Sequence, residues 1–391
     1  MIENIFRGGR KYWLLVSGLL VLLAAGVAAY LQQWNIGLAV TGLSRDVSWG
    51  LYIANFTFFV GVAASAVMIV IPYYLHNTKE FRRILILGEF MAVAACLVAI
   101  TFILVDLGQP SRVFNILLYP TPGSVIFWDV VVLSVYLLLN IILGWVALDA
   151  EYKETAPPDW LKPVAIVSII WAVSIHTVTA FIYAGLAARS FWLTALLAPR
   201  FLASAFASGP ALLILIALAM KKWGGFEPGD KSLDKVAKIV AYAIIITIFF
   251  LVLEIFTVFY SQEPDAMAHF QYLLFGLDGY YGLVPWLWTS VTLACAAIIL
   301  LVIPAWRKNH LTLALACAAV FISIWIDKGL GLIVPGFIPS PLGNITEYNP
   351  TMLEILITMG VWAMGGLILT LLLRVVLGVR QGHSRLTAVD K

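Results

Sequence analysis

The chain has 391 residues, of which 62% are hydrophobic and only 12% are charged, and its formal net charge is +3. A soluble domain carries about 25% charged residues, so this composition excludes an ordinary soluble globular protein. The apolar residues also fall in runs of about 20, the length that a helix needs to cross roughly 30 Å of hydrocarbon. The sequence therefore predicts an all-α integral membrane protein with one membrane domain over residues 1–391.

Hydropathy predicts about ten transmembrane helices. The first apolar stretch is long and opens a series of similar ones, so we interpret it as a retained helix and not as a cleaved signal peptide. In chain order, the predicted helices span residues 13–31, 50–75, 84–104, 125–148, 164–188, 201–220, 236–260, 283–303, 311–326 and 351–377.

The positive charges predict the orientation in the membrane. Ten crossings place both termini on one side, and the side that is rich in Lys and Arg faces the cytoplasm. Of the 24 Lys and Arg residues, nineteen lie on the side of the termini. We therefore expect a multi-pass protein of the cytoplasmic membrane with N-in/C-in topology. The five positive residues on the opposite side are Arg45, Arg112, Arg189, Arg200 and Lys328.

Several ionisable side chains fall inside the apolar segments. Each costs a few kcal/mol there, so each needs a partner, a water-filled cavity or a task. Most lie near the outer ends of their helices, whereas His176 lies near mid-membrane and Glu89 lies toward the cytoplasm. This distribution predicts one polar site that opens outward. The full set is Glu89, Asp106, Asp129, His176, Glu254, Asp327 with Lys328, and Glu354.

The acids near helix ends also have structural explanations. Asp106 could form an ion pair with Arg112 that fixes the loop between them. Asp129 and Glu354 fall in predicted first turns, where a carboxylate complements the helix dipole or caps the helix. For Glu354 we expect capping.

The remaining candidates lie deeper in the helices. Asp327 and Lys328 are adjacent and could neutralise one another, whereas His176 could hydrogen-bond within a core. Glu254 follows an apolar stretch and lies far from a first turn, so a functional role is favoured for it.

The residue set excludes several kinds of chemistry. Cys96, Cys295 and Cys317 are single, so the chain offers no ligand set for an iron-sulfur centre or structural zinc. A membrane haem needs two facing histidines, and only His176 lies at membrane depth. Walker, HExxH and GxSxG motifs are missing from the sequence, so neither a nucleotide-driven pump nor a membrane protease is supported. We expect no metal site and no nucleic-acid partner.

A polar pocket near the outer face could still bind a small amphiphile or pass protons. A quinone fits such a pocket, because its ring needs aromatic packing and its carbonyls need hydrogen-bond donors. Trp49, Tyr52 and Asn55 recur at spacings of three, and Thr179 and Tyr183 at a spacing of four, so each set is expected on one helical face. The same spacing is typical of helix packing, so a quinone site and a transport pathway both remain open.

Three segments resemble the NrfD family of membrane subunits, which includes the polysulfide reductase membrane anchor. They are W-G-L-Y-I-A at 49–54, D-L-G-Q-P-S-R at 106–112 and P-R-F-L-A-S-A at 199–205, and the second is the most specific. The stretch 326–350 looks more narrowly like the ten-helix members DsrP and HmeB, which belong to the DsrMKJOP complex of sulfate reducers.

This resemblance implies a haem-free subunit that binds menaquinone near the outer face. It implies electron exchange with a ferredoxin-like iron-sulfur subunit docked there, and further membrane and cytochrome subunits of a DsrMKJOP-like complex in sulfate or sulfite respiration. Such a subunit of an oxidoreductase complex would be inactive alone. The resemblance also implies two similar four-helix bundles, at about 49–188 and 200–338, with a peripheral helix at 13–31 and a last helix at 351–377.

By the same resemblance, Asp106 and Arg112 fall near the quinone pocket and Asn55 falls in a segment that lines it. Some relatives have a histidine where this chain has Phe58, so His176 or Tyr183 could protonate the quinone instead. A proton pathway through Glu89, His176 and Glu254 is a further expectation. The predicted catalytic residues are Asp106, His176 and Glu254, and the predicted quinone-binding residues are Trp49, Tyr52, Asn55, Arg112, Thr179, Tyr183 and Arg189.

Overall fold

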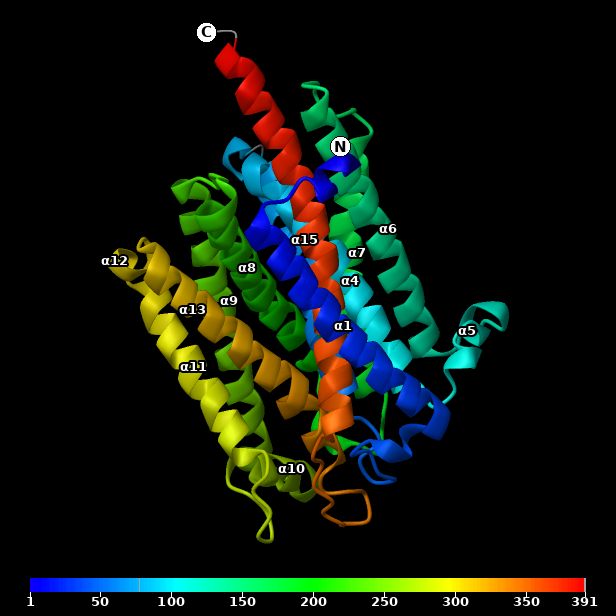
Figure 1. Ribbon diagram of the computed structural model, residues 1–391. Helices are drawn as coiled ribbons and strands as arrows, with labels where there is room; N and C mark the ends of the chain where they lie inside the picture. The colour runs from blue at the N-terminus through cyan, green and yellow to red at the C-terminus, as the bar shows by residue number, and fades with distance from the viewer. Residues whose placement is uncertain (77, 390–391) are drawn as a thin grey trace.

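The computed structural model describes residues 1–76 and 78–389 and is dominated by long helices (Figure 1). Within these residues, ten helices are long and apolar enough to cross a membrane, which confirms the predicted number. Lys391, counted above among the charges on the side of the termini, lies outside the described residues.

Most of the spans extend beyond the predicted bounds at one or both ends, whereas α11 is one residue shorter than predicted at each end and α7 ends four residues earlier. Hydropathy marks the hydrocarbon region, whereas a helix continues into the headgroup region, where charged side chains are solvated. The spanning helices are α1 (Arg10–Ile36), α2 (Leu51–Ala63) continued by α3 (Val67–Val70), α4 (Arg82–Asp106), α6 (Val125–Tyr152), α7 (Leu161–Ala184), α8 (Leu197–Gly224), α9 (Asp230–Ser261), α11 (Val284–Val302), α13 (His310–Ile324) continued by α14 (Gly331–Ile333), and α15 (Met352–Val389).

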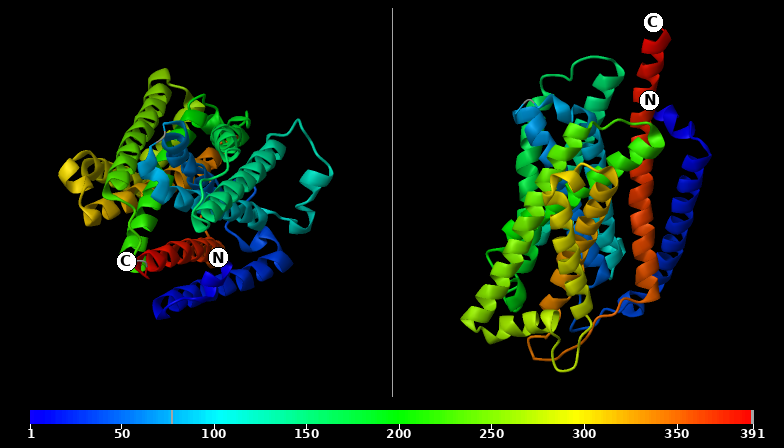
Figure 2. Two further views of the ribbon diagram at one scale, coloured as in Figure 1. Left: turned by 90° about the horizontal axis from the view of Figure 1, so that it is seen from above. Right: turned by 90° about the vertical axis from the view of Figure 1, so that its left-hand side faces the viewer.

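Eight of these spans pack as two groups of four. In the first group, α2 contacts α4 and α7, and α6 contacts α4 and α7. In the second group, α8 contacts α9 and α13, and α11 contacts α9 and α13. The groups meet where α8 packs against α2 and α7. Helices α1 and α15 lie together along one flank, with α15 against α4 (Figure 2).

The other short α-helices lie outside the spans. α5 (Asn115–Leu118) and α10 (Pro264–Leu274) lie on the side opposite to the termini, whereas α12 (Pro304–Arg307) lies on the side of the termini (Figure 1). α10 was not predicted, because its eleven residues are too short to produce a hydropathy signal.

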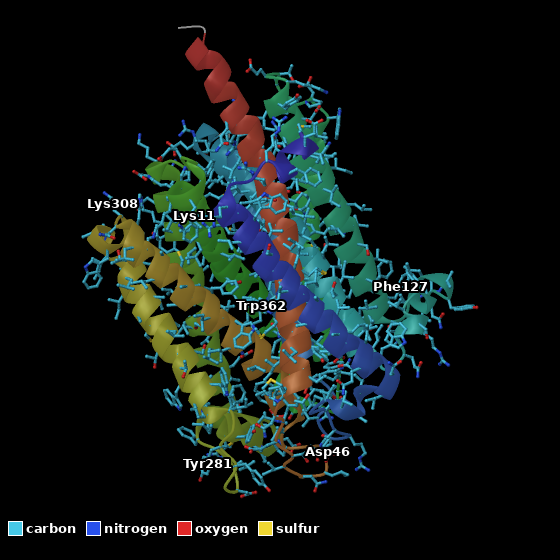
Figure 3. All side chains as sticks on the ribbon, in the orientation of Figure 1. Lys11, Asp46, Phe127, Tyr281, Lys308 and Trp362 are labelled. Atoms are coloured by element: carbon cyan, nitrogen blue, oxygen red, sulfur yellow. The ribbon has the colours of Figure 1, made fainter. Side chains whose placement is uncertain are left out.

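Both termini lie at the same end of the molecule, as the even number of spans requires (Figure 1). Asp46 and Tyr281 mark the opposite, outer end (Figure 3). The prediction that Arg200 and Lys328 belong to outer connections is wrong, because both are buried, in α8 and in the segment Trp325–Leu330. Removing them from the outer side strengthens the charge asymmetry that gives the orientation.

Two spans contain π-helical turns, one at the end of its span and one inside it. One turn covers Ile71–Leu75, where Pro72 lacks the N–H that a regular helix needs. The other covers Trp325–Leu330 between α13 and α14. π-Turns widen a helix and are often found at functional sites. The second turn carries two adjacent charged residues, Asp327 and Lys328, into the protein interior.

α1 and α15 approach so closely that their backbones touch. A Cβ atom added at Gly26 would lie 2.5 Å from the Cα of Gly360. Small residues permit such close contact between membrane helices, where association depends on van der Waals packing. By contrast, a Cβ added at Gly18 on the same helix would meet no atom within 4 Å.

We expect Gly26→Val to weaken the packing of α1 on α15 by about 1–3 kcal/mol, because the new side chain must push the backbones apart. The thermal midpoint of the detergent-solubilised protein measures the effect. Gly18→Val is the matched control and should leave the midpoint unchanged. An equal shift in both variants would show that the contact does not stabilise the protein.

Candidate functional site

Asp106 is the last residue of α4 and opens the D-L-G-Q-P-S-R element. Its Oδ1 atom is buried and has no hydrogen-bond partner among the described residues. Arg112 is exposed, and the described part of the chain shows no ion pair between the two side chains. The ion pair between Asp106 and Arg112 is therefore absent from the described residues. Oδ1 of Asp106 can still accept a hydrogen bond inside the protein.

A small pocket lies between this element and the outer end of α1. The hydroxyl of Tyr30, which also lines the pocket, is buried without a described partner. Nearby, the Tyr52 hydroxyl donates to Oε1 of Gln33 (2.7 Å), and Nε2 of Gln33 donates to the Val105 carbonyl (2.6 Å). The pocket has about 10 Å³ of space for water centres, roughly enough for one water molecule. Its lining is Tyr30, Gln33, Trp34, Gly37, Leu38, Leu107, Gly108 and Pro110.

Glu354 caps α15, as predicted. Its Oε2 accepts hydrogen bonds from the backbone N–H groups of Thr351 (2.9 Å) and Gly42 (2.6 Å). Its Oε1 accepts from the Tyr348 hydroxyl (2.6 Å), which in turn accepts from the N–H of Leu51 (2.8 Å). Burial raises the pKa of Tyr348, and the facing carboxylate raises it further. These bonds fix the start of α15 to the start of α2.

Aromatic rings close the outer ends of the two bundles. The ring centroid of Trp49 lies 5.7 Å from that of Tyr183, 5.9 Å from that of Trp192 and 5.7 Å from that of Phe337. The guanidinium of Arg189 lies 4.5 Å from the centroid of Phe337. Trp49, Tyr183 and Arg189 were predicted site residues, whereas Trp192 and Phe337 were not.

The guanidinium of Arg189 is affected by both burial and a neighbouring carboxylate. Burial lowers the pKa of Arg189, and Asp46 partly offsets that effect. One nitrogen of the guanidinium, Nη1, has no hydrogen-bond partner among the described residues. The cluster therefore places an incompletely paired cation next to rings at the outer surface.

The residues expected on one face of α2 contact different neighbours. Tyr52 bonds to Gln33 on α1, whereas Oδ1 of Asn55 accepts from the indole N–H groups of Trp325 (3.0 Å) and Trp362 (2.9 Å). Trp49 precedes α2 and packs on the aromatic cluster. Trp49 therefore lies outside the helix, and the three side chains contact different partners.

Asp129 and Thr179 form a buried pair. Oδ1 of Asp129 accepts a hydrogen bond from the Thr179 hydroxyl (2.6 Å). α6 begins at Val125, so Asp129 lies beyond the first turn, and the helix-dipole explanation does not apply. One turn along α7 from Thr179, the Tyr183 hydroxyl hydrogen-bonds to that of Thr57 and lies within electrostatic range of Asp106 and Asp129.

The second bundle holds a separate charged cluster. Arg200 on α8 pairs with Glu254 on α9 and with Asp327 (2.7 Å) on the π-helical turn. Lys328 forms no direct ion pair with Asp327 among the described residues, although mutual neutralisation was one possibility. Its ammonium instead donates to the Phe201 carbonyl (3.1 Å) and lies 4.3 Å from the centroid of that ring. The π-turn directs two adjacent residues to different partners.

The Lys328 ammonium reaches α2 of the first bundle. A Cβ atom added at Gly61 would lie 3.0 Å from Nζ of Lys328. The absence of a side chain at residue 61 therefore provides space for this charge.

Glu89 and His176 form no side-chain hydrogen bond with either group among the described residues. Both carboxylate oxygens of Glu89 and both ring nitrogens of His176 are buried without a partner among the described residues. The predicted single outward-opening site is therefore wrong: the acids lie around the first bundle's outer corner, around Arg200, and deeper in the membrane. Among the described residues, no group of three His, Cys, Asp or Glu side chains could hold a metal ion.

Comparisons with known proteins agree on one family. A protein of Halobacterium salinarum, predicted to be a membrane subunit of a dimethyl sulfoxide reductase, is 26% identical over 91% of this chain and 88% of its own length. A subunit of the selenate reductase of Mesobacillus selenatarsenatis is 24% identical over 84% of this chain and 85% of its own. The integral membrane subunit of an Hdr-like menaquinol oxidoreductase from Archaeoglobus fulgidus is 27% identical over 62% and 60%.

The family described as "Polysulphide reductase, NrfD" matches residues 39–338, from the connection after α1 to the end of the π-interrupted span. This region contains both four-helix groups, the D-L-G-Q-P-S-R element and the buried Arg200 cluster. The match covers well over half of the chain, and the chain therefore belongs to the NrfD family of integral membrane proteins.

Proposed function

We propose that this chain is a haem-free, quinone-reactive membrane subunit of a respiratory redox complex. It exchanges electrons between menaquinone or menaquinol and a ferredoxin-like iron-sulfur subunit on the outer face, and is inactive without its partners. The names of the relatives support the class, since they are subunits of reductases and of a menaquinol oxidoreductase. A DsrP-like place in a DsrMKJOP-like complex is the narrower form of the proposal, supported by the last of these.

One observation carries the proposal: two polar atoms, Oδ1 of Asp106 and the hydroxyl of Tyr30, are buried without partners among the described residues. Tyr30 lines the pocket, and Asp106 directly precedes Leu107 and Gly108, which also line it. Buried polar atoms are nearly always satisfied in proteins, so an unsatisfied pair next to a pocket indicates a missing ligand. A quinone supplies two carbonyl acceptors that take up protons on reduction. The pocket now fits about one water, so a ring requires the outer turns of α1 to move aside.

The residues of the chain then have distinct tasks. Tyr30 donates a hydrogen bond to a carbonyl, and Asp106 holds or releases the proton that accompanies electron transfer. Gln33 orients Tyr52 and fixes α1 to α4. Arg112 is exposed and lies at the end of the D-L-G-Q-P-S-R segment that begins with Asp106.

The test removes a single hydroxyl. We expect Tyr30→Phe to weaken binding of a menaquinone analogue to the purified complex about three- to tenfold, the usual effect of one hydrogen bond. Tyr12→Phe is a matched control, because the Tyr12 hydroxyl on the same helix is also buried without a described partner. Unchanged binding in Tyr30→Phe, or equal weakening in both variants, would reject the pocket.

A proton pathway, alone or coupled to the redox reaction, is the second candidate. It is favoured by the atoms of Glu89 and His176 that lack a described partner, which would need internal water to carry a proton. Vesicles containing only this chain distinguish the possibilities: proton or solute movement without a redox partner favours a transporter. A purely structural anchor is expected to bind no quinone and to move no protons.

A further inference from the structure

A large basic pocket lies at the end of the molecule that carries the termini. It occupies about 590 Å³ between the start of α4, the end of α6, the connection from α8 to α9, and α15. The views from above and from the side place the ends of these helices around one another (Figures 1 and 2). The residues that matter for its chemistry are Arg82, Arg83, Glu151, Phe226, Leu377 and Arg380.

Arg380 is held in a fixed position in this pocket. Its guanidinium donates to both carboxylate oxygens of Glu151 (2.6 and 3.2 Å) and to the Arg83 carbonyl (2.9 Å). It also lies 5.0 Å from the centroid of the Phe226 ring. A preorganised guanidinium loses little freedom on binding a further anion, which favours recognition of a phosphate or carboxylate group.

The other two arginines leave the pocket with excess positive charge. Arg82 and Arg83 are exposed and form no ion pair in the described part of the chain. Arg83 donates only a long hydrogen bond to the Glu227 carbonyl (3.4 Å). The Glu227 carboxylate itself pairs with Lys221 (3.2 Å). Both acids of the pocket are thus neutralised, and two guanidiniums face it without a counter-ion among the described residues.

One wall of the pocket is apolar and includes Leu377, which lies one turn before Arg380 on α15. Gly225 has a positive φ of 67°, and this turn folds the buried ring of Phe226 back against the helices. A ligand that fits must therefore carry an anionic group toward the arginines and an apolar part toward the bilayer.

We propose that this pocket binds the headgroup of an anionic phospholipid of the cytoplasmic leaflet. The phosphate lies between Arg82, Arg83 and Arg380, and the acyl chains leave past Leu377 into the bilayer. Basic pockets between helices at the cytoplasmic membrane surface recognise such headgroups through this combination of charges and apolar wall. The inference does not depend on the proposed quinone chemistry, which lies at the opposite end of the molecule.

The experiment uses the full-length protein in vesicles that contain equal amounts of phosphatidylglycerol and phosphatidylcholine. After mild extraction, mass spectrometry counts the lipids that stay bound. We expect the wild type to retain phosphatidylglycerol selectively, and Arg82→Gln/Arg83→Gln to retain about tenfold less. Arg7→Gln/Lys11→Gln removes two exposed positive charges on the same side and should retain as much as the wild type.

Three results would overturn the proposal: unchanged retention in the arginine variant, equal loss in the control variant, or equal retention of phosphatidylcholine. A further arm adds inorganic phosphate, and displacement of the lipid by millimolar phosphate would identify a free-phosphate site instead. Arg82→Lys/Arg83→Lys keeps the charge and should restore retention. Retention by this variant would show that the Gln variant loses lipid because it loses charge, and not because the protein misfolds.

Discussion

Asp106→Asn is expected to lower quinol-linked electron transfer by about 100-fold, while the complex still assembles. The substitution keeps the shape of the side chain but removes a group that can take up and release a proton, and such groups contribute about 10²–10⁴-fold to rates. The neutral amide also avoids burying a charge, so assembly should be preserved. The measurement is electron transfer from a menaquinol analogue to an artificial acceptor, normalised to the amount of assembled complex.

Asp278→Asn is the control for this prediction. Asp278 lies in an exposed outer loop with a positive φ of 49°, a conformation that Asn adopts readily. The same chemical change there should leave turnover as in the wild type. Full activity of Asp106→Asn would show that Asp106 takes no part in the reaction. An equal loss of electron transfer in both variants would indicate damage to partner docking.

Arg200→Met is expected to destabilise the protein by about 3–5 kcal/mol, the largest effect on stability that we predict. The substitution removes the guanidinium and leaves Glu254 and Asp327 buried with no described cation beside them except Lys328, which is bound to Phe201. The thermal midpoint and the yield of folded protein after detergent extraction should both fall sharply.

Neutralising the two carboxylates as well should reverse most of this loss. Arg200→Met combined with Glu254→Gln and Asp327→Asn removes the two carboxylates that the single substitution leaves unpaired, while Lys328 keeps its hydrogen bond to the Phe201 carbonyl. Replacements of a buried ion pair by neutral residues are often close to neutral in stability. If the triple variant is as unstable as Arg200→Met alone, packing of the arginine stem, and not charge balance, holds the three helices together.

The number of spans was predictable from the sequence, and the orientation stays a prediction from the charges. Each span needs about 20 apolar residues whatever its neighbours are, and the positive-inside bias is a property of the connections. The capping role of Glu354 was also predictable, because a cap depends on residues close in sequence such as Thr351.

The partners of the buried charges could not be predicted in the same way. Arg200 lies 54 residues from Glu254 and 127 from Asp327, and nothing local in the sequence indicates that they meet. Hydropathy placed Arg200 in a connection, because a charge at the end of an apolar run is taken for the end of the helix. Similarly, the tryptophans that donate to Asn55 lie 270 and 307 residues away.

The ammonium of Lys328 lies 3.0 Å from the position that a Cβ atom at residue 61 would take, so a side chain there would force the ammonium to shift. The identities of these two positions, far apart in the chain and on different bundles, are therefore tied to each other. Related proteins that have lysine at position 328 should therefore have glycine at position 61. Where a larger residue has replaced the glycine, a shorter or uncharged residue should have replaced the lysine.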